Sequence, residues 1–270
     1  DARDLRRDMS LMHSDAMSTP PVLVEMICNE VKRGHADRLN GLWNLSCSSA
    51  ILDPAILSEL VKNGFYINQC YSMTELAGYG LLNVTQEGDH LRALGKPDGF
   101  CEVKVDENGE ICVRGGCVML GYYKNEKDTH AVLDPDGWLH TGDMGTVDPD
   151  GTLYIRGRSK TMILTGSGQN IYPEEIEDKL NNMYLVLESL VLEHNGKLHA
   201  LVVPDYEQAE REGVDKNDLP QIMENNLKEL NTVVAGYEHV AAITIYPTEF
   251  EKTPKRSIKR YLYNVTLLGK

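Results

Sequence analysis

The chain has 270 residues and a formal net charge of −14, from 27 Lys or Arg and 41 Asp or Glu. This acidic balance argues against a general nucleic-acid binder, because phosphate backbones are held by basic surfaces. With 41% hydrophobic residues the chain is too apolar for disorder, and no apolar run reaches the roughly 20 residues of a membrane span, so we expect a soluble cytoplasmic protein.

The first 82 residues predict a sheet with helices packed on it. Helices are expected over residues 22–32 and 54–63, and short strands over residues 42–47 and 65–70. The second helix has Asp53 as an N-cap and a proline at its first position, which are common signals of a helix start. Alternation of strand and helix is typical of an α/β layer.

From residue 83 to residue 157 we expect mainly β-structure. Helical periodicity disappears, and the turn dipeptide Asn108-Gly109 separates two short strands over residues 101–106 and 110–114. A second hairpin is expected around residues 148–151. Asn-Gly and Asp-Gly turns are typical of hairpins because they tolerate positive φ. This density of turns favours an antiparallel sheet or an irregular barrel.

A small α+β module follows from residue 158. Pro173 opens a helix, Asn195-Gly196 forms the turn of a hairpin, a longer helix runs over residues 219–234 and a strand over residues 240–246. We therefore expect a domain boundary within residues 156–161. The expected fold class is α/β plus β plus α+β.

The six cysteines carry no signature of a metal site or a disulfide framework. None falls in a Cys-x-x-Cys pair, and the histidines do not cluster with them along the sequence. A chain of this length buries a sizeable core without disulfides. We expect reduced, buried thiols and no structural metal.

The stretch from Tyr71 to Glu75 directly follows the second apolar strand. The carboxyl ends of strands are where open α/β sheets bind ligands. Tyr71 can stack on a base, Thr74 can donate to a phosphate and Glu75 can hold Mg²⁺. The alternative is structural: Tyr71 packs, Thr74 caps the next helix and Glu75 occupies its first turn.

Three further stretches have either a ligand-binding role or a purely structural one. Asp143 either accepts hydrogen bonds from a vicinal diol such as a ribose or forms a turn. Gly166 and Gly168 either border an extended or phosphate-bearing ligand or belong to a flexible loop, and Ile171 excludes a dinucleotide fingerprint. After residue 251 there are six basic and no acidic residues, which is either a solvated tail or a mobile segment that brings a lysine to a phosphate.

The order and spacing of these stretches resemble those of the motifs of the adenylate-forming superfamily. This superfamily includes acyl-CoA synthetases, luciferases and the adenylation domains of peptide synthetases. Residues 48–52 are similar to its Gly-Gly-Ala-Pro-Leu segment. The other matching motifs are Tyr-x-x-Thr-Glu from Tyr71, Thr-Gly-Asp ending at Asp143, Gly-Arg-x-Lys from Gly157, Asn-Ile-x-Pro from Asn170 and Lys-Thr-Pro from Lys252.

This resemblance implies a domain arrangement and a two-step reaction. Residues 1–157 would be the C-terminal portion of the large AMP-binding domain, with α/β structure over 1–82 and a mainly β, barrel-like region over 83–157. Residues 158–270 would be the small mobile domain. The superfamily joins a carboxylate to ATP, giving an acyl-adenylate and pyrophosphate, and then usually passes the acyl group to a thiol. The implied cofactors are ATP, Mg²⁺ and CoA.

The resemblance also implies roles for individual residues. Ser49 and Ala50 would line the adenine pocket, and Tyr71 would stack on the adenine ring. Thr74 would contact phosphate, Glu75 would hold Mg²⁺, and Asp143 and Arg158 would bind the ribose hydroxyls. Lys160 would be the domain hinge, and the loop from Gly166 to Gly168 would border the pantetheine path.

Two features depart from the superfamily pattern. Its C-terminal catalytic lysine normally follows a Lys-Thr pair by four positions, which here is Ser257, so Lys255 and Lys259 are the candidates for that role. Its Ser/Thr/Gly-rich phosphate loop is not found between Asp1 and Cys47. The chain therefore looks like the C-terminal half of a longer enzyme, inactive without the missing N-terminal half.

The substrate is indicated by the C-terminal segment. Glu-Lys-Thr-Pro from Glu251 and Ile-Lys-Arg-Tyr-Leu from Ile258 resemble long-chain fatty acyl-CoA synthetases. We therefore expect an ATP-dependent acyl-CoA ligase that acts on a fatty acid, with CoA as acceptor. The alternatives are an adenylation domain that loads an amino or aryl acid onto a carrier protein, and a catalytically silent nucleotide-binding fragment.

Overall fold

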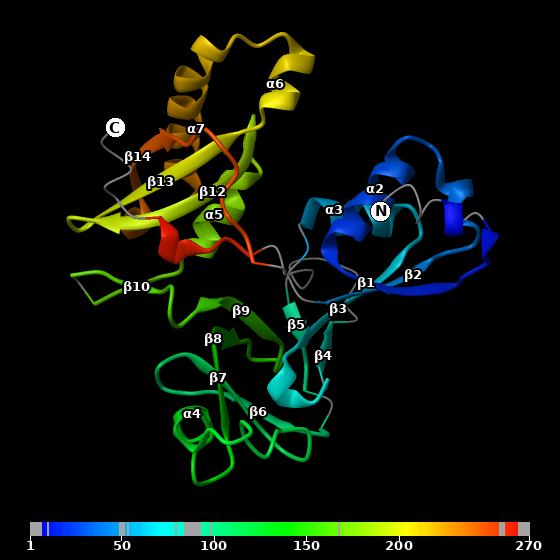
Figure 1. Cartoon of the computed structure of the whole chain (residues 1–270), viewed down its shortest axis with the longest axis vertical. Coiled ribbons are helices and arrows are strands. Elements are labelled where there is room, and N and C mark those ends of the chain that lie inside the picture. Colours follow the sequence, from blue (N-terminus) through cyan, green and yellow to red (C-terminus); the bar gives the residue numbers. More distant parts are fainter. Residues whose placement is uncertain are drawn as a thin grey trace. The chain divides into compact units, whose positions relative to one another are not determined.

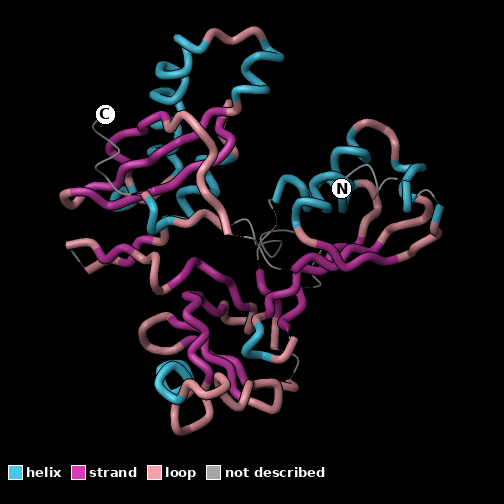
Figure 2. The backbone as a smooth tube through the Cα atoms, in the orientation of Figure 1, coloured by secondary structure: helices cyan, strands magenta, loops and turns pink. Residues whose placement is uncertain are grey.

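The computed structural model describes residues 7–9, 11–48, 52, 54–78, 80–83, 93–97, 99–166, 168–253 and 257–263. The chain divides into two compact units, Asp1–Ile155 and Arg156–Lys270, and each is described by itself (Figure 1, Figure 2). Within the described ranges, no helix combines the length and the apolar character that a membrane span requires.

The first unit begins with a sheet whose four described strands run in the order β1 (Ala16–Thr19), β2 (Asn44–Ser48), β3 (Tyr66–Ser72) and β4 (Gly80–Asn83). The first three strands are parallel, and β4 is antiparallel to β3. Helices α2 (Pro21–Lys32) and α3 (Pro54–Lys62) lie on the same face of this sheet (Figure 1). The expected alternation of strand and helix is confirmed, and Asp53, the expected N-cap, lies outside the described residues.

Local signals fix both ends of α2. Pro20 is the N-cap with φ −72° and ψ 160°, and Pro21 occupies the first helical position, where a missing N–H costs nothing. Just past the end, Gly34 has φ +75°, a conformation that glycine adopts without strain. Ile27 of α2 then packs in one buried cluster with Leu45 of β2.

The second sheet of this unit has its described strands in the order β5 (Ala93–Gly95), β9 (Leu153–Arg158), β8 (Leu139–Val147), β7 (Glu110–Arg114) and β6 (Glu102–Val105). β6 and β7 are antiparallel and joined by the expected turn at Asn108-Gly109, where Gly109 has φ +86°. The described strands form an open sheet. Of the two expected forms, sheet or irregular barrel, the structure has the sheet.

One helix in this region was not expected from the sequence. α4 spans Glu126–Val132, and the side chain of its N-cap Asn125 accepts a hydrogen bond from the N–H of Asp128. All seven residues of α4 are described, and none of them is buried. Hydrophobic periodicity therefore carries no signal for this helix, whose start is fixed by its cap alone.

The expectation that every thiol is reduced is wrong at one pair. Cys101 and Cys117 are joined in a disulfide, whereas Cys28, Cys47, Cys70 and Cys112 are in no disulfide. The reason is the β6–β7 hairpin: Cys101 immediately precedes β6 and Cys117 lies just after β7. A pair brought together by strand pairing cannot be recognised from sequence spacing alone.

The second unit is a small α+β module with a sheet of three described strands in the order β12 (Val186–His194), β13 (Lys197–Pro204) and β14 (Val240–Ile245). Its helices are α5 (Pro173–Asn181), α6 (Tyr206–Glu212) and α7 (Leu219–Val233), and β10 (Ile163–Leu164) pairs with β11 (Asn170–Ile171). The expected hairpin turn is confirmed, with φ +51° at Asn195 and +76° at Gly196. The long helix and the strand expected after it are confirmed as α7 and β14.

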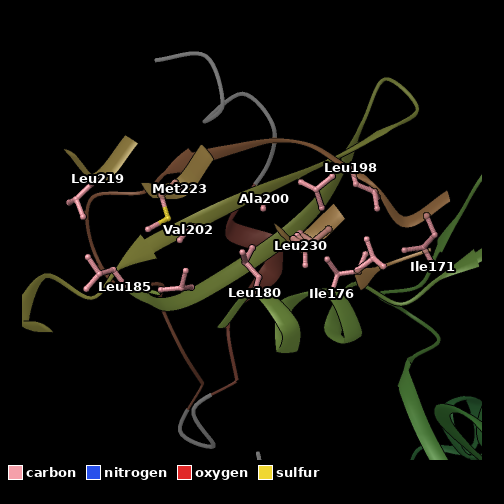
Figure 3. Close-up of a cluster of buried hydrophobic side chains, with 14 of the residues drawn as sticks. Ile171, Ile176, Leu180, Leu185, Leu198, Ala200, Val202, Leu219, Met223 and Leu230 are labelled. Atoms are coloured by element: carbon pink, nitrogen blue, oxygen red, sulfur yellow. The ribbon is translucent and has the colours of Figure 1, made fainter. Parts of the chain in front are cut away.

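The core of the second unit lies between its sheet and its helices (Figure 3). Ile176 and Leu180 of α5 are fully buried against Ala200 of β13, and Leu230 of α7 belongs to the same cluster. These positions recur every three or four residues on the helices, as an amphipathic helix requires.

The segment that follows β14 packs back on the opposite set of strand side chains. Phe250 and Tyr263 are buried in a cluster with Leu190 of β12 and Leu201 of β13. Their rings meet edge to face at a centroid distance of 4.9 Å, a favourable aromatic arrangement. The C-terminal basic segment is therefore attached to the unit on both sides of residues 254–256.

Candidate functional site

The two motif residues Tyr71 and Asp143 lie in direct contact. The Tyr71 hydroxyl donates a hydrogen bond to Oδ2 of Asp143 at 2.6 Å, although 72 residues separate them in the sequence. Tyr71 is half-buried in β3 of the first sheet, and Asp143 lies in β8 of the second sheet with 2% of its surface exposed. The short distance is typical of a hydroxyl that donates to a carboxylate.

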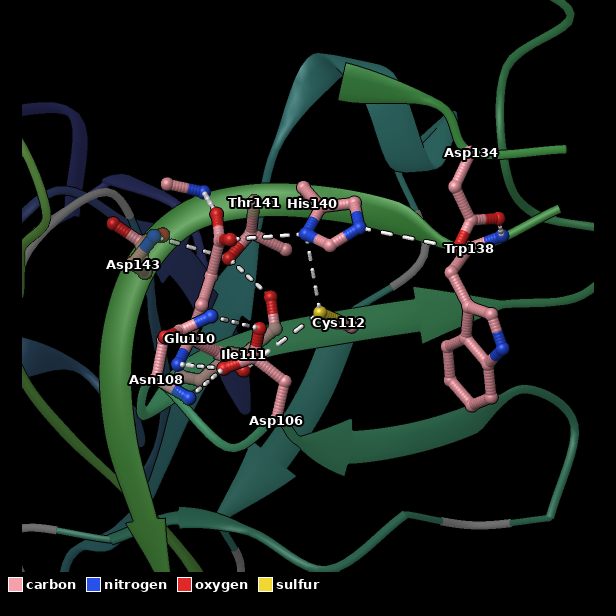
Figure 4. A network of polar contacts seen from close by, with 11 residues as sticks. Asp106, Asn108, Glu110, Ile111, Cys112, Asp134, Trp138, His140, Thr141 and Asp143 are labelled. Atoms are coloured by element: carbon pink, nitrogen blue, oxygen red, sulfur yellow. Dashed lines mark hydrogen bonds and ion pairs between the residues drawn. The ribbon is translucent and has the colours of Figure 1, made fainter. Parts of the chain in front are cut away.

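The backbone around Asp143 is held by a short polar network (Figure 4). The N–H of Gly142 donates to Oε1 of Glu110 at 2.7 Å, and the Thr141 hydroxyl donates to the carbonyl of Ile111 at 2.7 Å. The N–H of Asp143 in turn donates to that hydroxyl at 3.1 Å. Gly142 has φ +73°, which favours glycine. Strand β7 thus fixes the orientation of the Asp143 backbone.

Thr74 and Glu75 form the first turn after β3. They begin a 3₁₀ helix, Thr74–Leu76, whose N-cap is Met73. The alternative prediction that Thr74 caps this helix is therefore wrong. Glu75 is half-buried, and its Oε1 accepts a hydrogen bond from the Tyr122 hydroxyl at 2.8 Å. This hydrogen bond raises the pKa of Tyr122. The Glu75 carbonyl also accepts the N–H of Met119 at 2.8 Å.

Arg158 ends β9, a strand that crosses the division between the two units, and Lys160 follows in an exposed turn. The Arg158 carbonyl accepts the N–H groups of Thr161 and Met162 at 3.1 and 3.0 Å. The turn is tied to α5, because the Thr161 hydroxyl donates to Oε1 of Glu174 at 2.6 Å. The side chain of Lys160 therefore projects from a turn whose backbone is held.

Gly168 lies in the tight connection between β10 and β11. It has φ +83°, and its N–H donates to the carbonyl of Thr165 at 2.9 Å. The N–H of Gln169 donates to the Thr165 hydroxyl at 2.9 Å. This part of the glycine loop is a hydrogen-bonded hairpin turn.

The C-terminal candidates differ in what the structure describes. Lys259 donates from Nζ to Oε2 of Glu251 at 3.2 Å, and its N–H donates to the carbonyl of Glu251 at 2.8 Å. The carbonyl of Ser257 accepts the N–H of Thr253 at 2.8 Å. Three of the expected site residues, Ser49, Ala50 and Lys255, lie outside the described residues.

Sequence reasoning missed two residues that hold the site. Glu110 accepts the N–H of Gly142, and Tyr122 contacts Glu75. Glu110 follows the Asn-Gly turn and Tyr122 lies in a loop, so neither belongs to a motif. The pairing of β7 with β8 is the only signal that would have found Glu110, because Glu110 is paired with Met144 just beyond Asp143.

The comparisons with known proteins agree with this geometry. Residues 2–123 match the family model described as "AMP-binding enzyme". "Long chain acyl-CoA synthetase 6, peroxisomal" of Arabidopsis thaliana is 32% identical over 282 aligned residues, which cover 90% of this chain and 39% of the relative. The chain belongs to the adenylate-forming family.

Other relatives widen the range of acids. A feruloyl-CoA synthase of an Amycolatopsis species is 35% identical over 171 residues, which cover 59% of this adenylate-forming chain and 34% of the relative. The chain thus spans less than two fifths of the length of either curated relative, 39% and 34% respectively.

Solved structures of adenylate-forming enzymes share the fold of this chain. The o-succinylbenzoate-CoA synthetase MenE of Bacillus subtilis, solved in complex with ATP and a magnesium ion, matches with a TM-score of 0.77 at 24% identity. The match covers 97% of the adenylate-forming chain and 54% of that structure. The fold of this chain is therefore that of the adenylate-forming enzymes.

Proposed function

We propose that this chain is part of an ATP-dependent acid–thiol ligase that adenylates a carboxylic acid and transfers the acyl group to CoA. The observation that supports this best is the hydrogen bond between Tyr71 and Asp143. It brings together two motifs of the adenylate-forming family from two different sheets, and an aromatic ring beside a carboxylate suits a nucleoside.

The first unit would bind the adenosine of the nucleotide. The Tyr71 ring would stack on adenine, Ser49 and Ala50 would line the adenine pocket, and Asp143 would accept hydrogen bonds from the ribose hydroxyls. Because Asp143 is almost fully buried, its hydrogen bonds are little weakened by competing water. The backbone network on β7 and β8 would hold this carboxylate ready before the nucleotide arrives.

Thr74 and Glu75 would serve the phosphates. They follow β3 directly after Tyr71, so one short turn carries the base contact and the phosphate contact. Glu75 fits a magnesium ligand: it offers one half-buried carboxylate, and Mg²⁺ is usually held by one or two carboxylates together with substrate phosphates. Bound Mg²⁺ would neutralise phosphate charge during displacement.

The second unit would supply groups for both steps. We assign residues 1–157 to the C-terminal portion of the large AMP-binding domain and residues 158–270 to the small mobile domain. Arg158 would bind the ribose, Lys160 would be the hinge, and the loop with Gly168 would border the pantetheine of CoA. Lys255 or Lys259 would assist adenylation in place of Ser257.

A fatty acid is the proposed substrate, and an aryl acid is the second candidate. The C-terminal segment from Glu251 to Leu262 favours the fatty acid, as do the long-chain relatives. The feruloyl-CoA synthase among the relatives favours the aryl acid. We propose the cytoplasm as the location, although the Arabidopsis relative is named as peroxisomal.

Pyrophosphate release by the complete protein that carries this chain tests the proposal. ATP would be supplied with fatty acids or with ferulate, each with and without CoA. We expect release that depends on the acid, and an acyl-CoA product only when CoA is present. Absence of acid-dependent release across both acid classes would refute ligase activity, and transfer only to a phosphopantetheinylated carrier protein would favour the carrier-protein alternative.

A variant ties the activity to the site. Asp143→Ala removes the ribose acceptor, and loss of a hydrogen bond to a charged group costs about 1.5–3 kcal/mol, so we expect the KM for ATP to rise about tenfold or more. Asp136→Ala changes an exposed carboxylate of the same β7–β8 connection and should leave the KM unchanged. An equal KM in both variants would exclude Asp143 from nucleotide binding.

A further inference from the structure

A second polar cluster lies on β7, β8 and the turn after β6, and it shares only Glu110 with the site described above. It consists of Asp106, Glu110, Cys112 and His140, each of which offers one ligand atom, and these atoms all lie within 4.8 Å of one another. Asp106 directly follows β6, Glu110 and Cys112 are two residues apart on β7, and His140 is on β8. Cys112 and His140 are directly paired across the strands. Alternation along β7 and this pairing bring all four groups to one face of the sheet.

The imidazole of His140 is the centre of this cluster (Figure 4). Its Nδ1 lies 2.9 Å from Oε2 of Glu110 and 3.6 Å from Sγ of Cys112. Its Nε2 lies 3.9 Å from Oδ2 of Asp134, a residue outside the four. One ring nitrogen thus faces two ligand atoms, while the other lies near a carboxylate but beyond hydrogen-bond distance.

The other ligands are also held in place. Oδ1 of Asp106 accepts the N–H groups of Asn108 and Glu110 at 2.9 and 2.8 Å. Oε1 of Glu110 accepts the N–H of Gly142 at 2.7 Å, so its Oε2 is directed towards His140. Glu110 thus uses one oxygen to fix its orientation and presents the other to His140, whereas Oδ2 of Asp106 also accepts the side-chain amide of Asn108 at 3.4 Å. A preformed set of this kind loses little conformational entropy when an ion binds.

Charge and burial favour a cation at this place. Cys112 is buried, and the remaining three residues are half-buried, so a cation has a path from solvent. Two carboxylates beside a buried thiol create a negative potential that a bound cation would neutralise.

The donor set identifies the class of ion. Thiolate and imidazole are ligands of Zn²⁺ and its neighbours in the first transition row, whereas Mg²⁺ and Ca²⁺ require oxygen ligands alone. Four ligands of the types S, N and O match the usual coordination number of Zn²⁺. We propose that Asp106, Glu110, Cys112 and His140 bind a divalent transition-metal ion of the zinc class, separate from the Mg²⁺ proposed at Glu75.

Such an ion would cross-link three strands beneath the nucleotide site. It would join the end of β6 to β7 and β8, and through Glu110 it would stiffen the Gly142 N–H contact next to Asp143. The role is structural, because the four ligands would fill a tetrahedral coordination sphere and leave no open position for substrate.

Titration of the 270-residue chain with Co²⁺ and Zn²⁺ tests the site. The chain would be prepared in buffer free of chelators and thiols, and Zn²⁺ affinity measured by competition with a chromophoric chelator. We expect one Zn²⁺ or Co²⁺ per chain, and the Co²⁺ form should show the near-ultraviolet charge-transfer absorption of a cobalt–thiolate bond. Excess Mg²⁺ should not displace either ion.

Variants separate this site from incidental thiol binding. Cys112→Ser should abolish the cobalt–thiolate absorption and weaken Zn²⁺ binding at least tenfold, and Glu110→Gln should weaken Zn²⁺ binding while keeping that absorption. Cys70→Ser removes another free, partly exposed thiol and should change neither. Circular dichroism of each variant checks that it is folded. Absence of stoichiometric binding by the unaltered chain, or a cobalt–thiolate absorption that persists in Cys112→Ser, would overturn the proposal whatever the outcome of the ligase test.

Discussion

Asp143 is the residue on which the account of nucleotide binding depends. A carboxylate with 2% of its surface exposed destabilises a fold unless hydrogen bonds replace its lost hydration. The Tyr71 hydroxyl provides one such bond at 2.6 Å, and the backbone of Asp143 is fixed through Thr141. A charged group kept at this depth, at the end of a family motif, is better explained by a ligand than by stability.

Removal of the Tyr71 hydroxyl tests the contribution of this pair to the fold. Tyr71→Phe withdraws a donor from a buried carboxylate, and we expect the free energy of unfolding to fall by about 1–3 kcal/mol. Urea unfolding of the chain measures it. Tyr66→Phe alters a half-buried tyrosine on the same strand, and it should lower the free energy of unfolding by less than Tyr71→Phe does. If both variants unfold at the same urea concentration, the Tyr71–Asp143 bond does not stabilise the first unit.

The backbone before Asp143 offers a second test. Gly142 has φ +73° with open space where a Cβ would lie, so Gly142→Ala introduces strain without a clash. We expect a loss of about 1–2 kcal/mol in unfolding free energy and weaker AMP binding, because Asp143 would be displaced. Gly116 also has open space around a Cβ, but its φ is not in the positive range, so Gly116→Ala is the matched control. Equal AMP affinity in the two variants would show that the Gly142 conformation does not position Asp143.

At the scale of elements, the C-terminal segment is held to the second unit by a buried ion pair. Nη1 of Arg260 lies 2.8 Å from both carboxylate oxygens of Glu177 in α5, and Nη2 donates to the carbonyl of Val191 in β12 at 2.8 Å. Oε1 of Glu177 also accepts the N–H of Val191 at 2.6 Å. One arginine therefore joins the segment, a helix and a strand, and it directly follows the candidate Lys259 in the chain.

Breaking this pair should give a pH-dependent loss of stability. Burial raises the pKa of Glu177 to about 7 from 4.5, with Arg260 acting in the opposite direction. In Arg260→Met the pKa of Glu177 rises further, because the opposing charge is removed. Glu177 of the folded chain then keeps a proton that the unfolded chain releases above pH 4.5. Stability is then retained below that pH and lost as the pH rises through the folded-state pKa. We expect a loss of about 3–5 kcal/mol at pH 8 and a smaller one at pH 5.

Urea unfolding at the two pH values measures this effect. Arg211→Met, an exposed position on α6, is the control and should differ little from the unaltered chain at either pH. A loss for Arg260→Met that is the same at both pH values would mean that Glu177 does not change its protonation in this range.

The elements that the sequence predicts are those with local signals. The proline at the start of α2 and Gly34 after it, and the Asn195-Gly196 turn, act on their own neighbours and are readable without a partner. α4 was missed because no apolar face reports it, and the Cys101–Cys117 disulfide because it depends on strand pairing. Information that resides in a pairing register is absent from a local pattern.

At the scale of the whole molecule, the same division applies to the candidate site. Motif order indicated Tyr71, Glu75 and Asp143, but the contact of Tyr71 with Asp143 depends on how the two sheets of the first unit meet. Glu110 belongs to no motif, and His140 directly precedes the Thr-Gly-Asp motif without an expected role. The sequence expectation of no structural metal rested on spacing along the chain. The cluster with Cys112 is formed across paired strands, where such spacing carries no information.

The most direct test of the account is AMP binding by the 270-residue chain, measured by titration calorimetry. If Tyr71 and Asp143 form the adenosine site, the unaltered chain binds AMP, and Asp143→Asn weakens the affinity about ten- to hundredfold, as expected for loss of hydrogen bonds to a charged group. Asp136→Asn should bind as the unaltered chain does. No binding, or binding that Asp143→Asn leaves unchanged, would contradict the claim that this pair holds the nucleotide.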